Sequence, residues 1–400
     1  MANENPNKRD LNSESRFGEV SSKSQFSPSF AEGDKGGGLD SPNARESSQS
    51  KSTQTHSKLA HFPIMLFASV MGIGGLALAF KKASVAFGAN ADFADSSANF
   101  AQNQNQNLTS FSEIFECASV ILGFASMGIF ALLLGIYGLK IATHFAQFRA
   151  EATHQVKINF LSAIPIGALI IITFLGAFND NKSVLFALQI AFFISAFLQL
   201  FLSVFVINFW FSNAMKRHLL SPAWFIPIVG NLIVPLAGHS AKINPEFSLL
   251  FFAIGCFFWL ILTALITSRL IFEESLESKF LPTLFIFIAP PSIFVVDFVA
   301  LFGGHSALSL VAYFVALFFM LLMLSLSKVF VHLNFALSWW AFTFPLCAFS
   351  IASFEVFVGF GTLLYALFGI FGLMLATFAV LFVAYKTLMA MKKGKICVAE

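Results

Sequence analysis

The sequence predicts an all-α integral membrane protein with ten transmembrane helices arranged as five hairpins. The 400-residue chain is 57% hydrophobic and only 11% charged, with a mean hydropathy of +0.78, which is far more apolar than a soluble domain. From residue 61 onward, apolar runs of about 20 residues recur, and each is long enough to cross a bilayer as a helix. The prolines alternate along these runs, which predicts how the helices are paired.

Ten apolar runs define the predicted spans, and together they form one transmembrane transporter or channel domain over residues 59–390. They cover residues 62–80, 115–140, 158–178, 183–212, 221–239, 247–272, 281–302, 305–328, 332–355 and 360–388. The boundary between the seventh and eighth spans depends only on Gly303, Gly304 and His305. A polar loop that includes the Asn- and Gln-rich residues 102–107 is expected between the first and second spans.

Two tails flank this domain. Residues 1–58 are rich in Ser, Asn, Gly, Lys and Glu, and they hold too few large apolar side chains to offset the entropy of ordering. We expect a disordered cytoplasmic tail there, either regulatory or simply solvated. Residues 391–400 are expected to form a short cytoplasmic tail at the other end of the chain.

The distribution of Lys and Arg predicts the orientation. With ten spans both termini share one side, and the loops and C-terminus of that side carry twelve Lys and Arg residues. The opposite loops are expected to carry only four, namely Lys81, Lys82, Lys182 and Lys242. The excess of positive charge marks the cytoplasmic side. The sequence therefore predicts a multi-pass protein of the cytoplasmic (inner) membrane with both termini in the cytoplasm.

Nine prolines fall within the predicted spans, and all nine are in odd-numbered spans. Proline lacks an amide hydrogen and bends a helix, and the freed carbonyls must be satisfied inside the protein. The bent helices are therefore expected to face inward around a shared axis, with the straight even-numbered helices outside against lipid. Pro63, Pro222 and Pro282 lie near span starts, where proline is harmless. The expected kinks are at Pro165, Pro227, Pro235, Pro290, Pro291 and Pro345.

The ninth span contains the segment Trp-Trp-Ala-Phe-Thr-Phe-Pro at residues 339–345. An aromatic pair beside a proline kink is a candidate pore constriction. The alternative for Phe344 is ordinary packing, since the chain has 54 Phe residues.

Asp297 is the acid expected inside the membrane, in the seventh span, whereas Lys and Arg lie near span ends. It is a proton-coupling site, a cavity residue or a structurally paired acid in a water-filled vestibule. Glu116 and Glu355 lie near the ends of their predicted spans and are expected to reach water.

Other classes of function find little support. No catalytic pairing of Ser, Cys, His or acids is visible at depth, so a membrane enzyme or sensor is the least favoured class. No phosphate-binding Gly-rich loop followed by Lys is present, the four cysteines form no close pairs, and the basic residues form no stripe for nucleic acid. We expect no metal and no cofactor. The glycines at 72, 74 and 75, and those at 123, 128 and 135, are expected to be close-packing positions on helix faces.

Three motifs resemble one family. They are Trp224-Phe-Ile-Pro-Ile-Val-Gly230 with Pro235-Leu-Ala-Gly238, Leu281-Pro-Thr283 with Ala289-Pro-Pro-Ser292, and Trp340-Ala-Phe-Thr-Phe-Pro345. Over residues 62–386 the chain resembles the tellurite-resistance, C4-dicarboxylate and plant slow-type anion channel family, whose members have ten helices.

This resemblance implies a pseudo-fivefold bundle in which the odd helices line one pore per subunit, and it implies a homotrimer with three separate pores. It also implies that a phenylalanine of the ninth helix plugs the pore, and that position matches Phe344 rather than Phe342. The sequence departs from the pattern in the first span, where Pro63 stands only at the entrance, so glycines are expected to supply the flexibility there.

Two functions follow from these expectations. The first is an anion channel, or channel-like uniporter, for small inorganic or organic anions in which Phe344 is the gate; the absence of Lys and Arg at mid-membrane suits weak binding and fast release. The second is a proton-coupled carrier for C4-dicarboxylates, tellurite or sulfite-type oxyanions in which Asp297 takes part.

Overall fold

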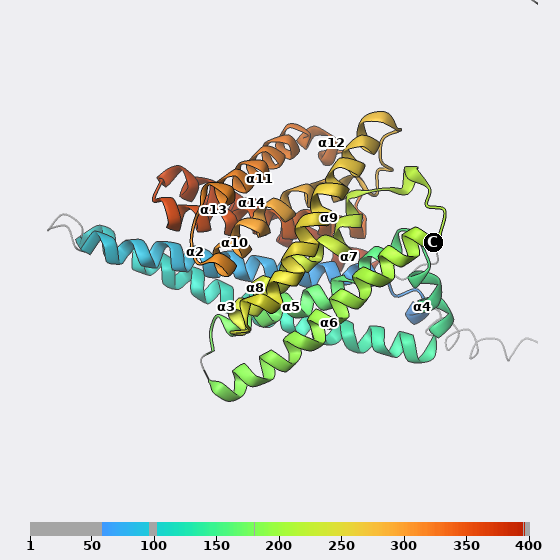
Figure 1. Ribbon diagram of the computed structural model, residues 1–400, viewed down its shortest axis with the longest axis horizontal. Helices are drawn as coiled ribbons and strands as arrows, with labels where there is room; N and C mark the ends of the chain where they lie inside the picture. Colours follow the sequence, from blue (N-terminus) through green and yellow to red (C-terminus); the bar gives the residue numbers. More distant parts are fainter. Residues whose placement is uncertain (1–57, 96–101, 180, 395, 397–400) are drawn as a thin grey trace, which may run out of the picture. The chain divides into compact units, whose positions relative to one another are not determined.

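The computed structural model describes residues 58–95, 102–179, 181–394 and 396, and the side chains of residues 89–110 are outside this description. The described residues contain helices and connecting segments but no strand (Figure 1). The expected disordered tail at residues 1–58 lies outside the described residues except for its last position.

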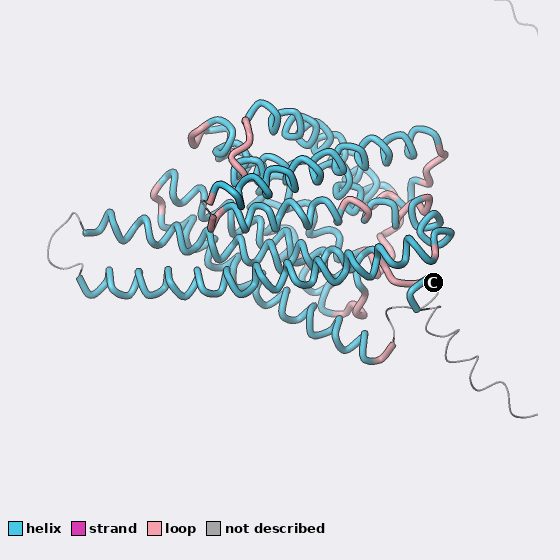
Figure 2. Tube along the Cα trace, turned by 90° about the horizontal axis from the view of Figure 1, so that it is seen from below, coloured by secondary structure: helices cyan, strands magenta, loops and turns pink. Residues whose placement is uncertain are grey.

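Ten helical segments of the described chain are long and apolar enough to cross a membrane, which confirms the predicted number. They are Ile64–Gly88, Phe111–Thr143, Lys157–Gly176, Lys182–Ser212, Pro222–Ser240, Pro245–Phe272, Leu281–Phe302, Ala307–Ser325, Leu337–Phe360 and Leu363–Lys392. The seventh and eighth spans separate at Gly303, whose φ of 73° is the left-handed conformation in which glycine commonly ends a helix. Figure 2 shows the helices running side by side, with most connecting loops at two opposite ends.

The odd-numbered spans are composite, because each contains a 3₁₀ segment and at least one α-helix. They are built from η1 (Ile64–Leu66) and α2 (Phe67–Asp95); η2 (Lys157–Phe160) and α5 (Ala163–Gly176); η4 (Pro222–Trp224), α7 (Phe225–Val229), η5 (Gly230–Leu232) and α8 (Ile233–Ser240); η6 (Leu281–Ile288) and α10 (Ala289–Phe302); and η7 (Leu337–Phe342) and α13 (Thr343–Phe360).

The even-numbered spans are uninterrupted α-helices. They belong to α3 (Gln102–Thr143), α6 (Lys182–Ser212), α9 (Pro245–Phe272), α11 (Ala307–Ser325) and α14 (Leu363–Lys392). The sixth span begins two residues earlier than expected and so includes Pro245, but this proline is the first helical residue, where its missing N–H costs nothing.

The prolines explain where the odd spans change geometry. All six expected kink prolines are the second or third residue of an α-helix that follows a 3₁₀ segment, as Pro165 is in α5, Pro290 in α10 and Pro345 in α13. A proline in this position cannot donate to the preceding turn, so the preceding turn tightens into 3₁₀ geometry.

Contacts between the helices confirm the five hairpins. Each odd span packs against the even span that follows it, as α2 does with α3 and α13 with α14. The odd spans also form a closed ring of neighbours, in which α2 contacts α5, α5 contacts α8, α8 contacts α10, α10 contacts α13, and α13 contacts α2. In the most apolar stretch of each span, 72–89% of the residues are buried in odd spans and 22–39% in even spans. The odd spans are therefore inside.

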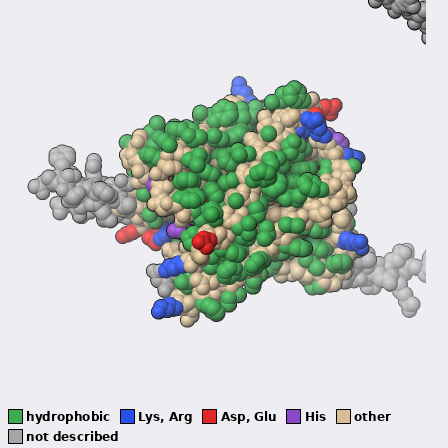
Figure 3. Space-filling model, viewed as in Figure 1, with side chains coloured by type: hydrophobic (Ala, Val, Ile, Leu, Met, Phe, Trp, Pro, Cys, Tyr) green, Lys and Arg blue, Asp and Glu red, His purple; other side chains and the backbone are tan. Residues whose placement is uncertain are grey.

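The even helices present their apolar side chains outward. Phe201 of α6, Leu260 of α9 and Phe378 of α14 are each more than 60% exposed. Figure 3 shows hydrophobic side chains over the middle of one face and most of the charged ones toward two opposite ends, as a bilayer requires.

The junction between the first two spans differs from the expectation. Helix α2 continues to Asp95, and α3 begins at Gln102, so the Asn- and Gln-rich residues are helical rather than a loop. Figure 2 shows these two helices running on past their neighbours. Lys81 and Lys82 are consequently helix residues within the first span and not loop residues. The wrong boundary arose because hydropathy falls at these lysines although the helix does not end.

A buried ion pair joins the end of the second span to the segment that follows it. Lys140 is fully buried, with its Nζ 2.8 Å from Glu151 Oε2 and 2.7 Å from the backbone oxygen of Phe62, to which it donates. Glu151 belongs to the short helix α4 (Phe145–Ala152) and also accepts a 3.0 Å hydrogen bond from Tyr137. Lys140 thus lies near the end of its span, as expected of Lys and Arg, but its ammonium is held by buried partners within the protein.

Glycines allow the ring helices to approach closely. A Cβ at Gly72 would overlap the Thr343 side chain, and one at Gly75 would lie 2.9 Å from the Phe344 ring. Gly74 and Gly123 are similarly crowded, which confirms four of the six expected positions. Gly128 and Gly135 face open space, so they are not close-packing positions within this chain.

Candidate functional site

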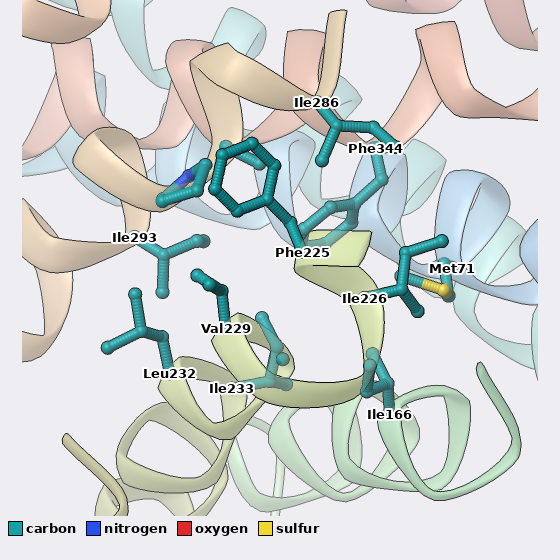
Figure 4. A pocket seen from close by; sticks show the side chains of 13 residues that line it. Met71, Ile166, Phe225, Ile226, Val229, Leu232, Ile233, Ile286, Ile293 and Phe344 are labelled. Atoms are coloured by element: carbon teal, nitrogen blue, oxygen red, sulfur yellow. The ribbon is translucent and has the colours of Figure 1, made fainter. Parts of the chain in front are cut away.

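The five odd spans line a small, partly open apolar cavity of about 60 Å³. Its lining comes from every odd span, and Figure 4 shows the labelled apolar side chains around it. The lining residues are Met71, Ile166, Phe225, Ile226, Val229, Gly230, Leu232, Ile233, Ile286, Ala289, Pro290, Ile293 and Phe344. Because the cavity holds no charged side chain, a hydrated ion would lose its water there without compensation.

Phe344 contributes its ring to this cavity and is 9% exposed. It lies in the first turn of α13, directly before Pro345. The turn that precedes it is fixed, because Thr343 Oγ1 donates to the Trp340 carbonyl at 2.7 Å and Trp340 Nε1 donates to Thr387 Oγ1 at 3.1 Å. On α2, Gly75 faces the Phe344 ring, and because glycine has no Cβ the ring can pack directly against the α2 backbone. The backbone at Phe344 is therefore held firmly, and the ring meets a flat helix surface.

Phe342 has a different environment. Its ring centroid is 4.7 Å from that of Phe285 and 5.6 Å from those of Phe330 and Trp339, in edge-to-face arrangements. It does not line the cavity. The two phenylalanines of the motif thus separate into one at the cavity and one in an aromatic cluster.

Span five shows how the bent helices satisfy their freed carbonyls. The Pro227 carbonyl accepts hydrogen bonds from Gln199 Nε2 at 2.9 Å and Ser203 Oγ at 2.7 Å, both from the straight helix α6. Asn231 Nδ2 donates to Ser203 Oγ at 2.8 Å and to the Ile228 carbonyl at 2.6 Å. Such a buried network replaces the regular helical bonds at the break, as a membrane interior demands.

The expected site prolines lie near the cavity, but Pro290 is the one that lines it. Pro227 and Pro235 are in the same span as six of its lining residues, and Pro345 follows Phe344 directly. Pro165 directly precedes the lining residue Ile166, and Pro291 directly follows the lining residue Pro290.

Asp297 is fully buried in α10, and neither carboxyl oxygen has a hydrogen-bond partner among the described residues. It lies four residues after Ile293 and seven after Pro290, so it shares the cavity-lining face of that helix. An unpaired carboxylate is costly to bury. Asp297 is therefore a buried acid on this face, with no ion-pair or hydrogen-bond partner among the described residues.

A second charged cluster was not anticipated. Lys82 Nζ of α2 lies 2.5 Å from Glu355 Oε2 of α13. His305, in the connection between α10 and α11, places Nε2 3.0 Å from the Glu355 backbone oxygen and 3.3 Å from Oε1. Glu355 is 7% exposed, so it does not reach water as expected. Lys82, His305 and Glu355 are far apart in sequence. The one sequence signal for the Lys82–Glu355 ion pair would have been that the first helix continues past residue 80 and so carries Lys82.

Within the described chain, no group of three or more His, Cys, Asp or Glu side chains is arranged to hold a metal ion. The candidate site is thus the apolar cavity with Asp297 on the cavity-lining face of α10, and the Lys82–Glu355 pair lies farther along α2 and α13.

A ring of broken helices around an apolar constriction, covered by continuous apolar helices, defines a multi-pass membrane protein with the construction of a channel or transporter. The family model described as "Voltage-dependent anion channel" matches residues 61–388. The chain belongs to this family of anion channels and transporters, and the resemblance found in its motifs is confirmed.

Three relatives illustrate the range of the family. The S-type anion channel SLAH3 of Arabidopsis thaliana is 29% identical over 58% of this chain and 36% of its own length. The guard cell S-type anion channel SLAC1 of the same plant is 24% identical over 61% of this chain and 44% of its own length. The tellurite resistance protein TehA homolog of Haemophilus influenzae is 24% identical over 58% of this chain and 69% of its own length. The match thus spans less than half the length of these two plant relatives.

Proposed function

We propose that this protein conducts small anions through a pore along the axis of the odd-numbered spans, and that Phe344 is its gate. The observation that carries the proposal is the cavity to which all five odd spans contribute and which Phe344 helps to fill. An apolar constriction stops ions because it offers them nothing in place of their water. Rotation of the ring away from Gly75 would widen the passage without moving the helix.

The closed contact ring of odd spans, each with a 3₁₀ segment before its main α-helix, supports a pseudo-fivefold arrangement. Family resemblance supports a homotrimer with one pore per subunit, for which the exposed apolar even helices offer surfaces. The excess of Lys and Arg in the loops on one side supports cytoplasmic termini and a cytoplasmic (inner) membrane location. We place a cytoplasmic tail at residues 1–58, the ten-span domain at 59–390 and a second tail at 391–400.

The gate is tested by recording anion currents from the Phe344→Ala variant. Removing the ring enlarges the apolar constriction, so chloride and nitrate conductance should rise at least tenfold above that of the unaltered protein. Phe342→Ala is the matched control, because it removes the same group from the aromatic cluster and not from the cavity. An equal rise in both variants, or none in Phe344→Ala, would contradict the assignment.

A second candidate function is proton-coupled transport of C4-dicarboxylates or of tellurite- or sulfite-type oxyanions. Asp297 favours it, because this buried acid has no partner and shares the face of α10 that lines the cavity. Uptake of labelled malate into proteoliposomes, with and without a pH gradient, distinguishes the two functions. A coupled carrier loses its response to the gradient in Asp297→Asn, whereas a channel shows none to lose.

A further inference from the structure

The ion pair between Lys82 and Glu355 lies on the inner faces of the two helices that meet at the gate. Lys82 follows Gly75 by about two turns of α2, and Glu355 follows Phe344 by about three turns of α13. Gly75 and Phe344 are themselves in contact range, at 2.9 Å from a Cβ position to the ring. Residues separated by whole turns share a helix face. Both charged side chains therefore continue the stripe that carries the gate.

The helical rise gives the spacing along the axis. Seven residues from Gly75 to Lys82 correspond to about 10 Å. Toward this end of the ring, Lys82 is the charged group that α2 places on the gate-carrying face, and Asp297 is the one that α10 places on its cavity-lining face. Lys82 has a side chain that is 22% exposed and Glu355 one that is 9% exposed, so the pair is neither sealed in the core nor free on the surface.

The neighbouring Lys81 faces another way. Its Nζ is 2.6 Å from Glu116 Oε1 of α3 and 4.1 Å from the centroid of the Phe178 ring. The partners of Lys81 therefore belong to the outer helix α3 and to the segment that follows α5, whereas Lys82 pairs with α13. The two adjacent lysines have the same charge at nearly the same depth, and only Lys82 forms an ion pair with the helix that carries Phe344.

We propose that Lys82 is an anion-binding residue of the pore, and that Glu355 competes with the anion and keeps its affinity low. This inference rests on the proposed function, because it requires anions to pass through the ring. The ligand class is a small monovalent anion such as chloride or nitrate. An ammonium has three N–H donors, and Glu355 is the partner that the described residues supply for Lys82.

Competition between Glu355 and the anion for Lys82 shortens the time for which the anion stays bound. A lysine without a partner in a low-dielectric wall would hold an anion too long, whereas a conducting site must release it as readily as it binds. With Glu355 in place, an arriving anion exchanges for the carboxylate and is then displaced by it. His305 also binds Glu355, so the carboxylate keeps one partner while Lys82 holds the anion.

The test measures current against chloride concentration at one pH, with Phe344→Ala as the background so that the gate is open. Lys82→Gln should raise the half-saturating chloride concentration by about fivefold, and Glu355→Gln should lower it by a similar factor. Lys82→Arg keeps the positive charge, so its half-saturating chloride concentration should stay near that of the Phe344→Ala background. Lys81→Gln and Glu116→Gln are the matched controls, and each should stay within about twofold of the background.

The double variant Lys82→Gln/Glu355→Gln decides whether the two residues act on each other. If Glu355 acts by competing for Lys82, its substitution has little further effect once Lys82 is replaced. The double variant leaves neither Lys82 nor Glu355 as an unpaired charge, so we expect it to fold even where a single variant fails; monodisperse elution in detergent checks this.

The outcomes separate the two claims. If the Phe344→Ala protein conducts but its half-saturating chloride concentration is the same with and without Lys82→Gln, this inference is overturned and the proposed function stands. Equal shifts in Lys81→Gln and Lys82→Gln also overturn it, because surface charge alone would explain them. A Phe344→Ala protein that passes no anion overturns the proposed function and this inference with it.

Discussion

The odd and even spans cross the same membrane in different ways, and the difference explains how a passage can exist inside the bundle. The even helices are continuous, so their backbones satisfy themselves and tolerate lipid. The odd helices are broken by 3₁₀ segments and rely on their neighbours for hydrogen bonds, as Pro227 relies on Gln199 and Ser203 of α6. The breaks let the odd helices change direction and pack closely around the cavity, and the continuous even helices separate these breaks from the lipid.

The largest effect should come from disturbing contacts within the ring. Gly72→Leu places a side chain where Thr343 lies, so we expect a loss of about 3 kcal/mol or failure to fold. Gly135→Leu, on an outer helix with open space around the glycine, should be tolerated. Apparent melting temperature in detergent measures both. Similar losses in the two variants would remove the distinction between inner and outer helices.

Removing the hydrogen bonds that α6 gives to the fifth span should have an intermediate effect. Gln199→Leu combined with Ser203→Ala leaves the Pro227 carbonyl without these donors, at a cost of about 2 kcal/mol. Ser212→Ala serves as the control, because that exposed hydroxyl on the same helix bonds only to Asn208 Oδ1 among the described groups. The expected order of melting temperatures is control above double variant, and the reverse would show that the break needs no support.

The smallest effect should come from Pro245, the proline that opens an even span. Pro245→Ala should change stability by less than about 1 kcal/mol, because this position needs no amide hydrogen. Pro345→Ala restores a donor beside the 3₁₀ segment of the ninth span and should also alter the current, since Phe344 is adjacent. If the two substitutions behaved alike in melting and in current, proline would not be what separates the two classes of span.

The sequence predicted the span number, the hairpins and the inner position of the odd spans, because each depends on local hydropathy or on proline. It also separated Phe344 from Phe342 through the motif, and their different surroundings agree with that separation. It missed the pairing of Lys82 with Glu355 and the burial of Lys140, which depend on contacts between distant segments. Hydropathy marks where a span leaves the lipid, but a helix such as α2 continues beyond that point.

The accessibility of Ile293 shows whether Phe344 closes a passage between the odd spans. Ile293 lines the same cavity from α10. Ile293→Cys, in a background without the four native cysteines, would be exposed to a charged, water-soluble thiol reagent. We predict slow labelling with Phe344 present and labelling at least tenfold faster in Phe344→Ala, with Phe342→Ala remaining slow. Equal rates in all three backgrounds would contradict the account.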